Sequence, residues 1–337
     1  MPAYQVTGNE YLSLPAISED TGAVEGLTVL HMGAKGLLEL SGGDKPLIAP
    51  VWRVNGEEQT PALEWHRENA WVPVARGEAR GMTVALTYLC PLGERAFFVR
   101  LEAENRRAAP LDVWLGVRGQ WTSTLHEVNE TIVLDGRRTQ EASGWNAAFV
   151  MQEVAGLPLC AFAPIAEADV QWIWGDMAFE GGRGALLAPG QRMCVELIFG
   201  VGVETVAAAT SAKHLLRLGY ARCLRETLEW LGKRMLSTRD AALSQMLNEN
   251  LFFSFFFASG RALDTEELCL MTSRSPRYYV SAAYWDRDSL LWSFPAIVLT
   301  DAAYAREILL HVFTRQIRNV GQHSRYIDGT LLEPGFE

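Results

Sequence analysis

The sequence of 337 residues lacks several features that would assign it to a common functional class. It has no Lys/Arg-rich block, and its net charge of −10 argues against a nucleic-acid partner, because phosphate binding requires a basic surface. Its most apolar window, residues 251–258, is too short to span a bilayer, so we expect no membrane partner. The N-terminus has no cationic segment followed by an apolar one, so we expect no signal peptide.

Cysteine is also scarce, and its spacing is wide. No CxxC pair occurs, which favours reduced thiols in a cytoplasmic protein over disulfides or a zinc site. The five cysteines are Cys90, Cys160, Cys194, Cys223 and Cys269. Because phosphate-loop, HExxH and GxSxG patterns are absent as well, we expect no cofactor and no metal.

Residues 1–205 are predicted to form an antiparallel β-sandwich. Val99, Leu101 and Ala103 alternate with charged residues, and a second alternating run follows over 111–118 after a turn-like segment. The two runs are predicted to pair as a hairpin with one buried face. Further strands are expected at 83–88, 147–152, 170–174 and 195–199. Many short strands with no helical period between them favour a sandwich.

The periodicity changes to that of a helix near residue 206. Apolar residues at helical spacing predict a linker helix over 206–237 and an all-α segment over 238–337. Within that segment a helix over 289–299 should bend near Pro295, and Thr300 or Asp301 should cap the next one. The stripe containing Leu243, Met246 and Leu247 needs a partner, so we expect self-association through an open helical half.

The run Tyr284-Trp285-Asp286-Arg287-Asp288 carries the clearest chemistry. A guanidinium donates and carboxylates accept hydrogen bonds, so Arg and Asp side by side can bind neighbouring sugar hydroxyls while an indole covers the apolar ring face. The alternative is a helix N-terminus, where Asp288 would serve only as a cap.

The Trp285-x-Arg287-Asp288-Ser289 run resembles the strand-to-helix segment of glucoamylase-type six-hairpin glycosidases. The resemblance implies that Arg287 and Asp288 bind hydroxyls of the terminal glucose and that Trp285 lines the same pocket. Glu333-Pro334 resembles a Glu-Pro-containing loop of that family, which implies that Glu333 borders the pocket. Gly335 stands where the family usually has Lys, so a contact to outer sugar units is not carried over.

The order of sandwich, linker helix and helical segment also resembles bacterial glucoamylases and their phosphorylase relatives. That likeness implies a supersandwich-like domain over 1–205 and the N-terminal part of an (α/α)6 barrel over 238–337, incomplete in this sequence. The family's general acid and base would fall after residue 337. Asp286 and Asp288 are rejected as that pair, because Arg287 beside them would lower both carboxyl pKa values.

A second group of candidate pocket residues lies in the final loop. His323, Tyr326 and Asp328 cluster there and are expected either to contact substrate, with Tyr284 and Asp286, or to form a solvated polar loop. The residues themselves indicate a sugar-binding pocket, and the resemblance implies an exo-acting, inverting glycoside hydrolase that takes an oligosaccharide or small glycoside and releases terminal α-glucosyl units. The alternatives are a glycoside phosphorylase of the same architecture and a non-catalytic sugar-binding fragment without turnover of its own.

Overall fold

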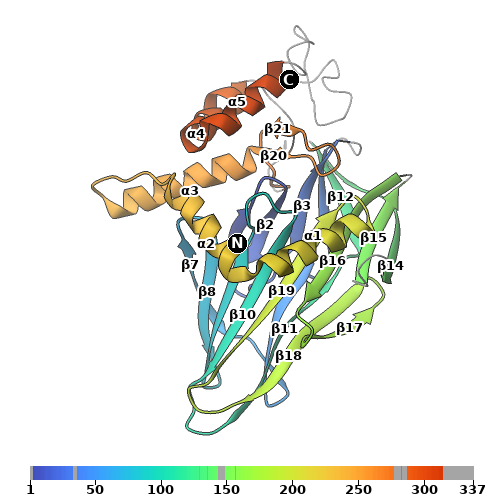
Figure 1. Ribbon diagram of the computed structural model, residues 1–337, viewed down its shortest axis with the longest axis vertical. Helices are drawn as coiled ribbons and strands as arrows, with labels where there is room; N and C mark the ends of the chain where they lie inside the picture. Colours follow the sequence, from blue (N-terminus) through green and yellow to red (C-terminus); the bar gives the residue numbers. More distant parts are fainter. Residues whose placement is uncertain are drawn as a thin grey trace.

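The computed structural model describes residues 3–32, 36–128, 130–134, 136–142, 149–155, 157–276, 282 and 287–313. Antiparallel strands occupy most of the described chain up to Gly202, and helices with one small hairpin follow (Figure 1). The strands form a β-sandwich, as the alternating pattern predicts.

Two joined sheets make up one layer of the sandwich. The six-stranded sheet has the order β1 (Tyr4–Gly8), β2 (Leu12–Ser18), β3 (Gly26–His31), β4 (Gly36–Ser41), β12 (Ser123–Val128) and β13 (Glu130–Val133). The five-stranded sheet has the order β17 (Gln171–Gly175), β18 (Ala178–Leu187), β11 (Leu111–Gln120), β5 (Ile48–Val54) and β6 (Glu57–Gln59). An antiparallel bridge between Val24 and Ile48 connects the two.

An eight-stranded sheet forms the opposite layer. Its order is β14 (Arg137–Ala142), β15 (Phe149–Ala155), β16 (Leu157–Ala166), β19 (Arg192–Gly202), β10 (Ala96–Asn105), β9 (Met82–Leu89), β8 (Val72–Ala79) and β7 (Ala62–Glu68). Every pairing within it is antiparallel.

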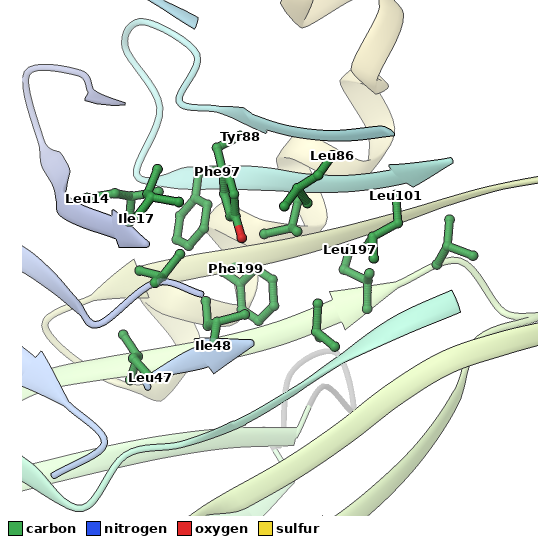
Figure 2. Packing of buried hydrophobic residues seen from close by; sticks show 14 of the residues in the cluster. Leu14, Ile17, Leu47, Ile48, Leu86, Tyr88, Phe97, Leu101, Leu197 and Phe199 are labelled. Carbon is green, nitrogen blue, oxygen red and sulfur yellow. The ribbon is translucent and has the colours of Figure 1, made fainter. Parts of the chain in front are cut away.

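The main hydrophobic core fills the space between the layers. Figure 2 shows Leu14, Ile17 and Ile48 of one layer facing aromatic side chains of the other, among them Phe97 and Phe199. The Phe97 and Phe199 rings stack with centroids 5.3 Å apart. Burying each side chain of this size stabilises the fold by about 1.5–3 kcal/mol, so the alternating apolar rows hold the two layers together.

The hairpin predicted over residues 97–118 is not formed. Strand β10 pairs with β9 and β19, whereas β11 pairs with β5 and β18 in the other layer. The connection between them therefore crosses from one sheet to the other. The buried Asn105 side chain fixes this corner, because its Nδ2 donates to the Ala109 and Leu187 carbonyls at 2.9 Å. An alternating strand buries its apolar face equally well whether the next strand along the chain pairs beside it or lies in the opposite layer. The alternating pattern alone therefore predicted the wrong pairing.

Two helices, not the single one predicted, follow the sandwich. Helix α1 (Thr205–Leu218) and helix α2 (Tyr220–Gly232) meet at Gly219, whose φ of 78° breaks the first helix. Figure 1 shows α1 running across the outer face of the eight-stranded sheet. Helix α1 lies very close to β19. A Cβ on Gly200 of β19 would come within 2.3 Å of the Ala208 carbonyl oxygen of α1. Small residues on both partners permit this approach.

The helical half contains α3 (Ala241–Phe257), the hairpin β20 (Ser259–Arg261) and β21 (Leu268–Leu270), a π-helix η1 (Arg287–Ser293), α4 (Phe294–Thr300) and α5 (Ala302–His311). Helix α3 buries its phenylalanine-rich end, and Phe256 stacks on Trp71 of the sandwich at 4.9 Å. The stripe predicted to need a partner is partly solvent-exposed at Leu243, Met246 and Leu247. The described residues after 238 do not close into a barrel, and none of the described helices is long and apolar enough to cross a membrane.

Candidate functional site

The predicted sugar-binding motif lies at the start of η1, and this helix has an uncommon form. Residues Arg287–Ser293 adopt a π-helix that continues directly into α4, where Pro295 occupies the first turn. Pro295 has no N–H to donate, so it cannot continue a regular α-helical ladder back into the preceding turn. Because π-helical turns are rare and frequently occur at functional sites, this geometry draws attention to the segment independently of its sequence.

Asp288 lies in the first turn of η1 and is half-buried. A carboxylate there is favoured by the partial positive charge of a helix N-terminus. The next residue, Ser289, is fully buried, and its hydroxyl has no hydrogen-bond partner among the residues that the structure describes. The motif therefore combines a half-buried acid with a buried hydroxyl on consecutive positions.

The other predicted site residues cannot be placed against Asp288. For Arg287 the backbone belongs to η1, and its side chain lies outside the described part of the chain. Outside the described residues altogether are Tyr284, Trp285, Asp286, His323, Tyr326, Asp328 and Glu333. Their roles remain predictions from the sequence.

A buried arginine shortly before the motif joins the two halves of the molecule. Arg274 is fully buried, and its Nη1 donates to the carbonyls of Asn9 in the sandwich and Phe256 in α3, at 2.5 and 3.1 Å. Burial lowers the pKa of Arg274 to about 10, so the guanidinium stays charged at neutral pH. One side chain thus links the β1–β2 turn to the helical half.

Glu10 is the acidic member of the same cluster. Its Oε1 accepts a hydrogen bond from the Gly93 N–H at 2.8 Å, and its Oε2 is buried without a hydrogen-bond partner among the described residues. Burial raises the pKa of Glu10, and the charges of Arg261 and Arg274 only partly oppose that shift. The β1–β2 turn fixes the position of Glu10 beside Arg274. We therefore regard the cluster of Glu10 and Arg274 as a structural joint between the sandwich and the helical half. Sequence reasoning missed it, since its members are far apart in the chain.

Metal-binding geometry is absent from the described residues: no three His, Cys, Asp or Glu side chains converge there. All five cysteines are free, and all but Cys194 are buried. Burial raises the pKa of Cys194 to about 12 and that of Cys223 to about 11. These thiols are therefore protonated at neutral pH, which does not suit a nucleophile.

A groove of about 1230 Å³ lies on the sandwich, away from η1. Strands β7, β8, β9 and β10 form its floor, and α2 forms one wall. The sequence contained one signal for it, the small outward residues Thr83, Ala85 and Thr87 on a single strand. That signal has meaning only once the neighbouring strands are known.

Comparison with known proteins gives a likeness of fold. No protein-family model matches the chain, and no curated protein matches its sequence. A solved structure described as a kojibiose phosphorylase from the human microbiome superposes with a TM-score of 0.54, 9% identity and coverage of 90% of this chain and 47% of its own. A bacterial glucoamylase complexed with acarbose superposes with a TM-score of 0.52, 8% identity and coverage of 99% and 54%.

The chain thus spans about half the length of each of these proteins. At such low identity the likeness concerns the fold alone. It extends over the sandwich, the two linking helices and the helical half together. We conclude that this chain has the fold of the corresponding half of a glucoamylase- or phosphorylase-like protein.

Proposed function

We propose that the chain forms the sugar-recognition part of an exo-acting glycoside hydrolase that releases terminal α-glucosyl units by inversion. The observation that carries this is the superposition of 99% of the chain, through both halves, on a glucoamylase. In this proposal residues 238–337 belong to an (α/α)6 barrel. The free thiols favour a cytoplasmic enzyme.

The proposed pocket lies around the N-terminal end of η1. Arg287 donates hydrogen bonds to two neighbouring hydroxyls of the terminal sugar, and Asp288 accepts from them. Trp285 covers one ring face, and Glu333 borders the pocket, with Tyr284 and Asp286 beside it. His323, Tyr326 and Asp328 contribute a pocket loop. The π-helix supports these roles, because its first turn leaves the Asp288 side chain only partly buried.

A glycoside phosphorylase is the second candidate, and the likeness to a protein described as a kojibiose phosphorylase favours it. A phosphorylase transfers the sugar to phosphate, whereas a hydrolase transfers it to water. The residues that hold the terminal sugar would serve both reactions equally.

Titration with acarbose tests the pocket. We expect saturable binding that Arg287→Ala weakens at least about tenfold, because a hydrogen bond from a charged group contributes about 1.5–3 kcal/mol. Arg306→Ala is the matched control, since Arg306 is an exposed arginine on α5. Equal affinities for the wild type and Arg287→Ala would refute the proposed role.

The reaction is tested by incubating the chain with maltose or kojibiose, with and without inorganic phosphate. Free glucose alone in both buffers supports the hydrolase, and sugar 1-phosphate formed only with phosphate supports the phosphorylase. Binding without product in either buffer is the outcome expected of residues 1–337 alone, because the general acid and base implied by the resemblance would fall after residue 337. Product formed by this chain would contradict that expectation.

A further inference from the structure

The groove on the outer face of the eight-stranded sheet has a shape that follows from strand register. Strands β7, β8, β9 and β10 place their outward residues in rows that run across the sheet. These rows are Glu64–Arg76–Ala85–Glu102, Glu78–Thr83–Glu104–Arg192 and Val74–Thr87–Arg100. In every row the member on β9 is small, and long charged side chains stand beside it on β8 and β10, except at Val74 on β8. A furrow therefore runs along β9 between two charged ridges.

Helix α2 closes one end of the furrow with apolar surface. Tyr220, Leu224 and Leu228 line that end. The Tyr220 ring is held in place, because the Arg100 guanidinium lies over it at 4.5 Å. The occupant must therefore present apolar patches as well as hydrogen-bonding groups.

The charges of the groove balance. Arg76, Arg100, Arg106, Arg192 and Arg225 line it together with Glu64, Glu68, Glu78, Glu102 and Glu104. Such a surface selects neither a polyanion nor a polycation. A neutral hydroxyl-rich chain fits it, because each hydroxyl can accept from a guanidinium and donate to a carboxylate.

The two charged ridges differ in how many of their charged groups are already ion-paired within the protein. On the β10 side, Arg100 pairs with Glu102 and Glu196 at 2.8 and 2.6 Å, and Glu104 pairs with Arg106 and Arg192 at 2.7 and 2.8 Å. On the β8 side, Arg76 and Glu78 are exposed and form no ion pair within the described part of the chain. One ridge is thus prearranged, and the other has free donor and acceptor groups.

We propose that this groove is a second, non-catalytic binding site for a neutral oligosaccharide. Its volume of about 1230 Å³ exceeds the ~300–1,000 Å³ of pockets that enclose one drug-sized ligand, so several sugar units can lie along it. No described residue of η1, α4 or α5 lines it, so it is separate from the pocket proposed around Arg287.

Isothermal titration with maltoheptaose, a neutral linear oligosaccharide, tests the groove, with Arg287→Ala as the common background of every protein compared, so that binding at the pocket proposed around η1 is weakened in all of them. We expect saturable binding that the double variant Arg76→Ala/Glu78→Ala weakens at least about tenfold, since both free charged partners are lost. The matched control is Arg222→Ala/Glu226→Ala, which removes an Arg–Glu pair from the outward side of α2. The control should bind as the Arg287→Ala background does.

A second variant keeps the test independent of the charged residues. Ala85→Trp places a large ring in the half-exposed floor of the furrow and should abolish binding, with an unchanged circular dichroism spectrum as evidence of folding. Unchanged affinity in either groove variant, or no binding at millimolar maltoheptaose, would overturn the assignment.

Two other results would also overturn it. Tighter binding of a heparin-derived oligosaccharide than of maltoheptaose would mean that the groove selects charge. A dimer in sedimentation that the groove variants dissociate would mean that a second copy fills it. These outcomes are distinct from failure of the proposed function, which is decided by acarbose and Arg287→Ala.

Discussion

Gly260 and Arg274 show how a single residue can decide the contact between the two halves. A Cβ on Gly260 would lie 3.0 Å from Arg274 Nε and 3.1 Å from its Cδ and Cζ. The guanidinium cannot retreat easily, because it is fully buried and donates to carbonyls of both halves. The backbone of Gly260 does not require a glycine, since its φ is not in the left-handed region. The close approach of the Arg274 side chain is what requires one.

Gly260→Ala should lower the free energy of unfolding by about 1–3 kcal/mol, the usual cost of overpacking a filled interior. Gly175→Ala is the control, because a Cβ there would meet its nearest neighbour at an ordinary 3.5 Å. Denaturant unfolding of both variants measures the difference. Equal midpoints for the two would contradict the tight fit at Arg274.

Glu10 gives the joint a dependence on pH. Because burial raises its pKa in the folded state above the ordinary 4.5, the folded protein binds more protons than the unfolded chain just above pH 4.5. The stability from this group is fully present below pH 4.5 and is lost as pH rises through the raised pKa.

Glu10→Gln should remove the loss of stability that occurs as pH rises through the pKa of Glu10. The variant keeps an acceptor for the Gly93 N–H, and its stability relative to the wild type should increase from pH 4 to pH 7. Unfolding midpoints across this range measure the effect. Parallel curves for the two proteins would show that the carboxyl is not perturbed.

At the scale of the element, α5 depends on its N-terminal residue. Asp301 caps the helix, as its position in the sequence predicts, and its Oδ1 accepts from the Ala303 and Tyr304 amides at 3.1 and 3.0 Å. Its Oδ2 accepts from Arg234 Nη2 at 2.6 Å, just beyond the end of α2. One carboxylate therefore both starts α5 and ties it to the linker segment.

Asp301→Ala should destabilise the protein by about 1–2 kcal/mol, because it removes the cap and the ion pair. Asp301→Asn preserves a capping oxygen and should cost less. Hydrogen exchange of the α5 amides separates the two effects: fast exchange in Asp301→Ala alone indicates that capping dominates. Equal exchange in both variants would instead assign the effect to Arg234.

At the scale of the whole molecule, the two halves differ in the surface they expose. The sandwich buries its apolar rows between two layers, whereas the helical half leaves large apolar side chains in solvent. Among them are Leu291, Trp292, Leu299 and Phe313, with exposed fractions of 64%, 73%, 65% and 57%. Exposed apolar patches of this kind favour association.

We expect the chain to self-associate with rising concentration, and Trp292→Ser/Leu299→Ser to reduce this. Ile173→Ser is the control, since Ile173 is 70% exposed but lies on the sandwich, outside the helical half. Sedimentation velocity over a range of concentrations provides the measurement. A wild-type protein that stays monomeric throughout would contradict the expectation.

The sequence predicted individual strands better than their neighbours. Residues 83–88 lie within β9, and the alternating runs that contain Leu101 and Val113 are β10 and β11. The predicted hairpin between the latter two was wrong, because β10 and β11 lie in opposite layers. A long linker helix was also wrong, since Gly219 ends α1.

For the candidate site, the sequence identified a motif, and the structure added the π-helix on which Asp288 lies. The sequence could not reveal the joint around Arg274, because the contacts of Arg274 lie up to 265 residues away in the chain. Nor could it reveal the groove, because the Glu–Arg–Ala–Glu row across β7, β8, β9 and β10 exists only after four strands are aligned.

The sequence by itself determined which side chains face the core and where α5 begins, because alternation and capping are properties of a few consecutive residues. Only the tertiary structure decided which layer each strand joins, what fills the space beside Gly260 and where a charged furrow forms. Those outcomes depend on strand register and on packing between distant segments, and a local pattern does not specify either of them.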